Sequence, residues 1–277
     1  MPRFELGTSP TRTERATRLR HTPRADRVAP VASRDEILAH ARDLLDLDAY
    51  PDYGPMGLQV VGSDEVTKIA AGVSSSRELH ELAALGGAQL LIVHHGLFWD
   101  NDPRIVDDQL KRRLEALFSG DITLAAYHLA LDAHPEIGNN ALLAGRLGVQ
   151  SQERVLELGF GGPLESPVGV EELAERLGQA TGQEARVFHG GPEQIERVAV
   201  ITGGAAKLFP QIAALEYDAF VTGEPAEPTL HLARELGVHF LAGGHYATET
   251  FGIKALAERL AERFDVDWEF LDLPNPV

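Results

Sequence analysis

The chain has 277 residues, a formal net charge of -17 and no cysteine. A chain of this length can bury a hydrophobic core without covalent cross-links. The lack of cysteine excludes disulfides, thiolate nucleophiles and cysteine-ligated zinc or iron–sulfur sites. An acidic surface repels phosphate backbones, so we expect no strong nucleic-acid binding.

The N-terminal segment differs from the rest in charge. Residues 1–34 hold eight arginines against three acidic residues, with few apolar side chains. We expect residues 1–32 to form a disordered basic tail, with an organelle transit peptide as the alternative. No apolar run is long enough to cross a bilayer, and the N-terminus lacks the apolar stretch of a signal peptide. We therefore expect a cytoplasmic protein without membrane contact.

The ordered part is predicted to begin at Ser33, which can cap a helix with an apolar stripe from Ile37 to Leu45. A loop marked by proline and glycine then runs through Met56. Beyond it, short apolar runs alternate with helical stretches, which is typical of α/β proteins. The predicted fold class is α/β.

Two segments of this alternation look like copies. Residues from Val66 and from Ile195 both read as strand, helix, strand, and the second strands begin at Leu90 and Ala219, at the same offset of 129 residues. A third strand follows each copy. Strand–helix–strand units resemble one another by chemistry alone, so the repeat leaves common ancestry open.

We expect three ordered parts. Residues 33–149 form a first α/β lobe and residues 150–244 a second lobe, which includes a helix over 170–181. Residues 245–277 supply a closing helix, from about Thr248 to Phe264, and a strand that complete the site.

Polar residues gather where the predicted strands end. The strands are followed by "HHG" after Val93, "YHLALDAH" after Ala126, "TGE" after Val221 and "GGHYATE" after Ala242. Open α/β sheets bind ligands beyond the carboxyl ends of their strands, so we expect a site there. The glycines of "ITGGAA" can either cradle a phosphate or form an ordinary turn.

His94 and His95 stand side by side at the end of an apolar run. Adjacent residues on a strand point to opposite faces, so the pair cannot easily bind one ion unless the backbone turns between them. Two ions, with one histidine each, satisfy both side chains. The alternative is that the pair only begins a polar loop.

Two carboxylates extend this candidate metal site. His245 and Glu249 are four residues apart and can face one point. A carboxylate has two oxygens, so Glu249 is a candidate to bridge two cations about 3.5 to 4 Å apart; a favourable charge at a helix N-terminus is the alternative. Asp132 is the remaining carboxylate, or a turn residue. His128 and His134 lie near it, and spacing alone does not choose between them.

Three stretches carry a resemblance to a known family: "IVHHGLFW", "HLALDAHPEIGNNALLA" and "TGEPAEPTLHLARELGVHFLAGGHYATETFGIKALAERL". Over roughly residues 33–273 the chain resembles the Nif-three-like dinuclear metal-centre family, also called GTP cyclohydrolase I type-two homologues. The resemblance implies two interlinked α/β lobes, two divalent ions, and a ring-shaped homohexamer built as a trimer of dimers. It implies metal ligands at His94, His95, Asp132, His245 and Glu249.

The sequence leaves the roles of three further residues open. Tyr246 stands where some members of that family have another histidine, which leaves the five ligands intact. Glu224 and His231 lie near the "TGE" strand end and can line the pocket, or have ordinary surface or helix roles.

Histidine and carboxylate ligands suit zinc, manganese, iron or nickel. Five ligands shared by two ions leave open positions for water, as in catalytic sites. The sequence therefore predicts a metal-dependent hydrolase, and the family name suggests a nucleotide such as GTP as its small substrate. The alternative is a non-enzymatic regulatory or protein-interaction ring. A two-metal phosphodiesterase is a weaker alternative, because Val93 precedes His94 where that class has aspartate.

Overall fold

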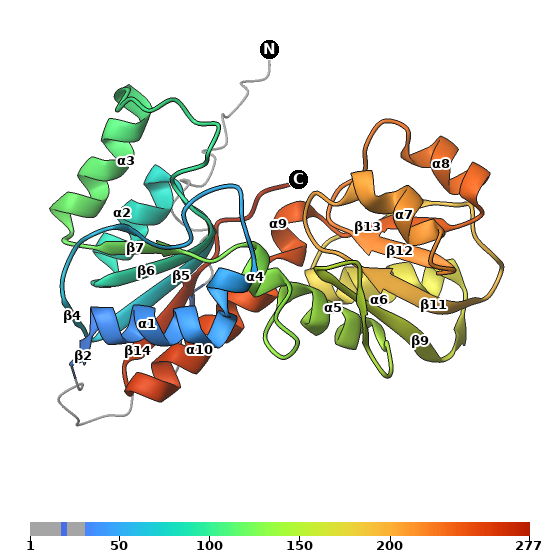
Figure 1. The fold of residues 1–277 in the computed structure, drawn as a ribbon, viewed down its shortest axis with the longest axis horizontal. Coiled ribbons are helices and arrows are strands. Elements are labelled where there is room, and N and C mark those ends of the chain that lie inside the picture. The colour runs from blue at the N-terminus through green and yellow to red at the C-terminus, as the bar shows by residue number, and fades with distance from the viewer. Residues whose placement is uncertain (1–17, 21–30) are drawn as a thin grey trace, which may run out of the picture.

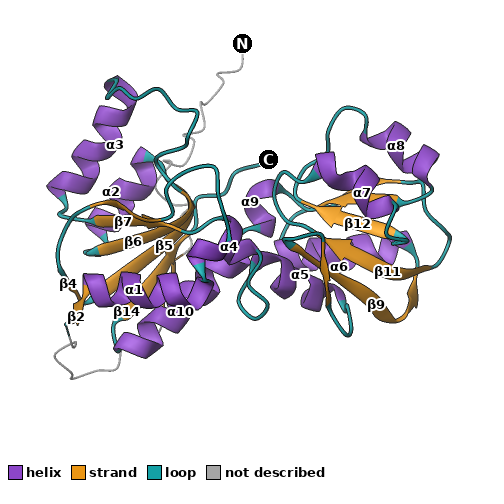
Figure 2. Cartoon of the chain, viewed as in Figure 1, coloured by secondary structure: helices purple, strands orange, loops and turns teal. Residues whose placement is uncertain are grey.

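The computed structural model describes residues 18–20 and 31–277 (Figure 1). Most of the predicted disordered tail therefore lies outside the described residues. The described part of this tail is β1 (Arg18–Arg20), which pairs antiparallel with β14 (Asp267–Leu271). The described residues form two six-stranded sheets with helices on both faces of each (Figure 2). This arrangement confirms the predicted α/β class.

The first sheet has the strand order β1-β14-β5-β6-β7-β3. Strands β14, β5, β6 and β7 are parallel, and β3 is antiparallel at the edge. Helices α1 and α10 pack on one face, and α2 and α3 on the other. The bounds are β3 Gly57–Val60, β5 Lys68–Ser74, β6 Leu90–His95, β7 Thr123–Ala126, α1 Arg34–Leu45, α2 Arg77–Leu85, α3 Asp108–Ser119 and α10 Thr250–Phe264.

The second sheet has the order β10-β13-β12-β11-β9-β8, with β11, β12 and β13 parallel and the other strands antiparallel to their neighbours. Helices α5 and α6 cover one face, and α7 and α8 the other. The bounds are β8 Glu153–Val155, β9 Gly159–Val168, β10 Arg186–Phe188, β11 Ile195–Val200, β12 Ala219–Thr222, β13 His239–Ala242, α5 Asn139–Leu147, α6 Val170–Thr181, α7 Phe209–Ala213 and α8 Thr229–Leu236.

Short elements complete the chain. The strands β2 (Ala32–Ser33) and β4 (Glu65–Val66) pair with each other. Within residues 31–277, 3-10 helices cover Leu47–Ala49 and Ala206–Leu208. Helices α4 (Leu129–Asp132) and α9 (His245–Thr248) lie between the two lobes (Figure 1).

The two lobes repeat one pairing register. In the first, Ile69 pairs with Leu90 across β5 and β6; in the second, Val198 pairs with Ala219 across β11 and β12. Val198 and Ala219 lie 129 residues after Ile69 and Leu90, which is the offset predicted from the sequence.

The end of the chain joins the lobes. Ile253, Leu256 and Leu260 of α10 pack against the first sheet, whereas Phe251 at its start packs in the second core. Strand β14 then inserts beside β5 in the first sheet. None of the helices in the described part of the chain has the length and apolarity of a membrane span.

The final helix lies close to its predicted position, but a short helix that was not predicted precedes it. A helix from about Thr248 to Phe264 was expected, and α10 covers Thr250–Phe264, whereas α9 ends at Thr248. Glu249 lies between them with φ -107° and ψ 8°, outside regular helix. This break allows the Glu249 side chain to turn inward between the lobes.

Candidate metal centre

The five residues predicted as metal ligands lie together between the two lobes. His94 and His95 end β6, and Asp132 ends α4. His245 begins α9, and Glu249 joins α9 to α10. Ion-pair distances of 3.2 to 3.6 Å connect all five side chains.

Glu249 is at the middle of this cluster and only 2% exposed. Its Oε1 lies 3.6 Å from His94 Nε2. Its Oε2 lies 3.2 Å from His95 Nε2 and 3.3 Å from His245 Nε2. The two oxygens of one carboxylate therefore face two different sets of imidazoles.

These contacts divide the cluster into two halves. The inner group is His94, Asp132 and Oε1 of Glu249; His94 Nε2 lies 3.5 Å from Asp132 Oδ2, and the His94 side chain is fully buried. The outer group is His95, His245 and Oε2 of Glu249, and its two histidine side chains are 21% and 30% exposed. Solvent therefore reaches the cluster from the side of the outer group.

Neighbouring strands orient the two adjacent histidines. His94 Nδ1 donates to the backbone carbonyl of Tyr127 at 2.8 Å. His95 Nδ1 contacts the hydroxyl of Ser74, at the end of β5, at 3.0 Å. In both rings Nδ1 is occupied, so Nε2 is left to face Glu249, as is usual for metal-ligating histidines.

The third histidine is held by the second lobe and the C-terminal segment. His245 Nδ1 lies 3.2 Å from Glu224 Oε1, beyond the end of β12. The next residue, Tyr246, donates its hydroxyl to Asp272 at 2.7 Å and its backbone N–H to the Val277 carbonyl at 3.1 Å. Tyr246 thus ties α9 to the C-terminal residues, on the side opposite His245.

Asp132 is anchored by an asparagine that also contacts α10. Asn139 Nδ2 donates to Asp132 Oδ1 at 2.8 Å, and the hydroxyl of Thr202 lies 3.4 Å from the same oxygen. Asn139 Oδ1 accepts from the backbone N–H of Gly252 at 2.6 Å. Asn139 is fully buried, so one side chain fixes Asp132 relative to the helix that follows Glu249.

The structure distinguishes the remaining histidines. His128 Nδ1 contacts Asp52 at 2.8 Å, and its ring centroid lies 5.0 Å from that of His94. His128 therefore belongs to the cluster. His134 accepts backbone N–H groups of its own turn, and His231 is exposed on α8.

Gly203 explains the glycines of "ITGGAA". It has a φ of 65°, and a Cβ atom there would lie 2.1 Å from Glu249 Oε1 and 3.2 Å from His245 Nε2. Its N–H donates to the hydroxyl of Thr248 at 3.1 Å. Only glycine allows the backbone to approach the buried carboxylate this closely, which favours the interpretation as a turn.

Two histidines hold their protons more tightly than usual. Burial lowers the pKa of His94, but the charges of Asp132 and Glu249 outweigh it and raise that pKa to about 9. Burial likewise opposes protonation of His245, but contact with Glu249 and Glu224 raises its pKa to about 9. The cluster thus attracts positive charge at both halves.

His95 and Glu249, at the centre of the cluster, both have lowered pKa values, and two buried polar atoms there form no hydrogen bond. Burial, together with the neighbouring His94, lowers the pKa of His95 to about 3, so this ring is neutral. Burial alone would raise the pKa of Glu249, but His94 and His245 hold it below its usual range. His94 Nε2 and Glu249 Oε2 are buried without a hydrogen-bond partner among the described residues. Such atoms need a further partner.

This donor set fits divalent cations. Neutral imidazoles and carboxylates are the ligands of zinc, manganese, iron and nickel in proteins. Among the described residues, three overlapping triads have their donor atoms within 4.8 Å of one another: His94, His95 and His128; His95, His245 and Glu249; His94, Asp132 and Glu249. Glu249 belongs to two of these triads.

Comparison with known proteins identifies the family. Residues 32–276 match the Duf34/NIF3 (NGG1p interacting factor 3) family, and the chain belongs to it. It is 43% identical over 236 residues to a GTP cyclohydrolase 1 type 2 homolog of Yersinia pestis, covering 84% of this chain and 95% of that protein. A homolog of the same name from Escherichia coli (strain K12) is 45% identical over 231 residues, covering 83% and 93%. The predicted family resemblance is confirmed.

Solved structures agree with this family. The protein ybgI, described as of unknown function, is 42% identical, covers 89% of this chain and 100% of its own, and superposes with a TM-score of 0.86. A protein from Thermus thermophilus is 40% identical, with coverages of 89% and 100% and a TM-score of 0.84. Reduced HcgD from Methanocaldococcus jannaschii is 23% identical, covers 88% and 100%, and has a TM-score of 0.80, which shows the fold alone.

The residues that orient the cluster were not predicted from the sequence. Ser74 ends a predicted strand, so the rule that sites lie at strand ends could have found it. Asp52 lies in an irregular loop, 76 residues from the His128 that it contacts. Asn139 contacts Gly252 across 113 residues. No local pattern marks the last two.

We predict that Asn139→Ala destabilises the fold. The change leaves the buried N–H of Gly252 without a partner, which costs about 1 to 3 kcal/mol, and it removes the shorter of the two hydrogen bonds to Asp132 Oδ1. Urea unfolding measures the loss. Asn101→Ala, in an exposed loop, is the control and should stay within about 0.5 kcal/mol of the parent protein. Equal stability of both variants would contradict the role given to Asn139.

We predict that divalent-cation affinity rises with pH between 7 and 9. In the metal-free protein His94 and His245, with pKa values of about 9, are protonated at neutral pH, and a cation that uses their Nε2 atoms must displace those protons. Calorimetric titration with zinc, in buffers of different ionisation enthalpy, should detect proton release at pH 7. An affinity that does not depend on pH over this range would contradict the assignment.

Proposed function

We propose that this chain is a dinuclear metal protein and acts as a metal-dependent hydrolase. Two ions are supported by the different contacts of the two Glu249 oxygens. Oε1 faces His94, whereas Oε2 faces His95 and His245. A bridging carboxylate needs this arrangement, because each oxygen must serve a different ion. One ion would use the inner group and the other the outer group.

The proposed ligands are the five residues that the sequence indicates. His94 and Asp132 would hold the inner ion, His95 and His245 the outer ion, and Glu249 both. Divalent zinc, manganese, iron or nickel at such a site supplies Lewis acidity, which activates water and stabilises negative charge that develops on a substrate.

The protein side chains define how a substrate would approach. The inner group is buried, so a substrate meets the partly exposed His95 and His245 first. Trp99 lies beside this entrance, with its ring centroid 6.2 Å from His95 and 5.3 Å from His128. We propose that the wall formed by Trp99 orients the substrate over the outer group.

His128 is our candidate for proton transfer. Asp52 Oδ1 engages its Nδ1 at 2.8 Å, and Asp52 Oδ2 accepts the backbone N–H of Leu129, also at 2.8 Å. A carboxylate held in this way fixes the orientation of an imidazole. His128 Nε2 would take a proton during hydrolysis and return it to the leaving group.

The substrate is proposed only as a class. The relatives named GTP cyclohydrolase 1 type 2 homolog support a small nucleotide-like molecule with an electrophilic carbon or phosphorus. Family membership likewise supports the predicted homohexamer, and the cytoplasmic location stays a prediction. The family description, NGG1p interacting factor 3, supports the alternative of a non-enzymatic protein-interaction ring.

The test combines metal reconstitution with one conservative variant. Metal-free protein receives zinc, manganese or iron singly and is screened against phosphoester, amide and nucleotide substrates. We expect turnover that requires metal and falls at least 100-fold in Glu249→Gln, because one neutral amide replaces the proposed bridging carboxylate. Glu262→Gln, on the exposed side of α10, is the matched control and should leave turnover unchanged.

Two results would contradict the proposal. Tight metal binding without turnover across the panel would favour the interaction ring. Turnover that survives in Glu249→Gln at the parent rate would show that the reaction occurs elsewhere on the chain.

A further inference from the structure

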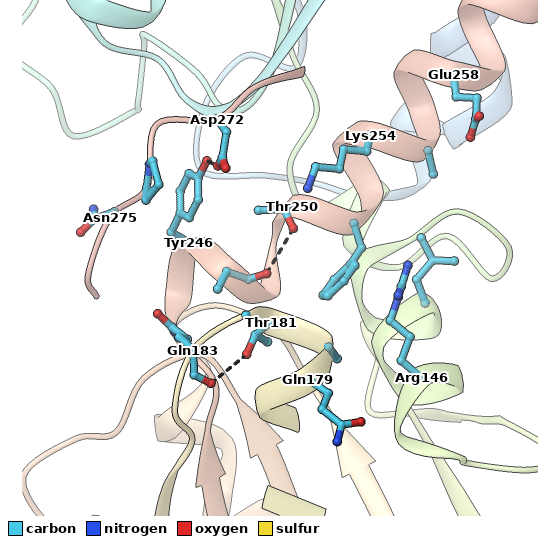
Figure 3. Close-up of a pocket in the computed structure, with 17 residues that line it drawn as sticks. Arg146, Gln179, Thr181, Gln183, Tyr246, Thr250, Lys254, Glu258, Asp272 and Asn275 are labelled. Atoms are coloured by element: carbon cyan, nitrogen blue, oxygen red, sulfur yellow. Dashed lines mark hydrogen bonds between the residues drawn. The ribbon is translucent and has the colours of Figure 1, made fainter. Parts of the chain in front are cut away.

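A second cavity lies on the other side of α9 from the metal centre. It has a volume of about 770 Å³ and is bounded by α5, the end of α6, the start of α10 and the C-terminal segment (Figure 3). Tyr246 and Thr250 line it, whereas the intervening Glu249 faces the metal centre. The volume is within the range of about 300 to 1,000 Å³ that is usual for small-molecule sites.

Two cations enter this cavity from different elements. Figure 3 shows Lys254 on α10 and Arg146 on α5 among the side chains that line it. Neither side chain forms an ion pair or hydrogen bond within the described residues. Unpaired cations in one cavity are unexpected in a chain with 42 acidic and 25 basic residues. Their mutual repulsion makes an anion the favoured ligand.

Aromatic rings hold both cations in place. The Arg146 guanidinium lies 4.9 Å from the ring centroid of Phe251, and Lys254 Nζ lies 4.2 Å from that of Phe270. These contacts are cation–π interactions. The charged groups are therefore positioned before a ligand arrives, which lowers the entropy lost on binding.

The Asp272 carboxylate attracts Lys254 through space, but no ion-pair contact joins a carboxylate of the cavity to either cation within the described residues. Asp272 accepts the hydroxyl of Tyr246 at 2.7 Å, so one of its oxygens is engaged. Glu258 is exposed and forms no ion pair with Lys254 among the described residues, although it lies one turn further along α10. Neither carboxylate neutralises Lys254 or Arg146 by direct contact.

The rest of the lining suits a ring-bearing ligand. Phe251, Ala247 and Leu142 supply apolar surface, and Phe251 is 8% exposed. Gln179 also lines the cavity, and its amide donates to Glu175 on the same helix (Figure 3). Apolar surface with a few polar groups is the usual composition of a cofactor or nucleotide site.

We propose that this cavity binds an organic phosphate of nucleotide size, with its phosphate at Lys254 and Arg146 and its organic part on the apolar lining. The site uses none of the proposed metal ligands. The proposed phosphate site can therefore be tested independently of the proposed hydrolase activity.

Calorimetric titration of the full chain tests this site. The protein is freed of metal by chelation and dialysis, so that phosphate cannot bind through cations at the metal centre. We expect adenosine 5′-monophosphate to bind more tightly than adenosine or inorganic phosphate alone, and its affinity to fall with added salt. Lys254→Gln and Arg146→Gln should each weaken binding about tenfold, because each removes a charge-assisted contact.

Arg112→Gln, on the exposed surface of α3, removes the same charge outside the cavity and should leave binding unchanged. Circular dichroism verifies that the variants fold, and Arg146 is exposed, so its replacement should not disturb the core. The proposal is overturned by equal affinity of the parent protein and both cavity variants. It is also overturned if the nucleotide shows no saturable binding at millimolar concentration.

Discussion

The constraint on which the site depends is the burial of the Glu249 carboxylate. It is 2% exposed and surrounded by imidazoles, and its closest buried neighbour of like charge is Asp132. Removing an ionised carboxylate from water costs several kcal/mol unless opposite charge compensates for it. Against the effect of burial, His94 and His245 are the groups that lower its pKa most. Protons on histidines, or cations, must supply that charge.

The fold meets this constraint by bringing loops from both lobes to one place. The first lobe provides His94 and His95 at the end of a parallel strand. The second lobe provides the glycine turn at Gly203 and the Glu224 carboxylate, each following a strand of its own parallel set. The break between α9 and α10 then directs Glu249 between them. Neither lobe holds the complete cluster alone.

The sequence predicted the parts of this arrangement that have local signals. The paired histidines after an apolar run, the helix over 170–181 and the repeated strand register all follow from patterns within short windows. The break at Glu249 did not follow, because the apolar stripe of the last helix begins only at Ile253 and does not show where the preceding turn ends. Asp52 and Asn139 act across 76 and 113 residues, so only the assembled fold shows their partners.

The central claim is that the two oxygens of Glu249 serve two different cations. Anomalous diffraction from crystals soaked in zinc, recorded above and below the zinc absorption edge, tests it directly. The account predicts two anomalous peaks, about 3.5 to 4 Å apart, on either side of the Glu249 carboxylate. A single peak, or peaks remote from that carboxylate, would contradict it.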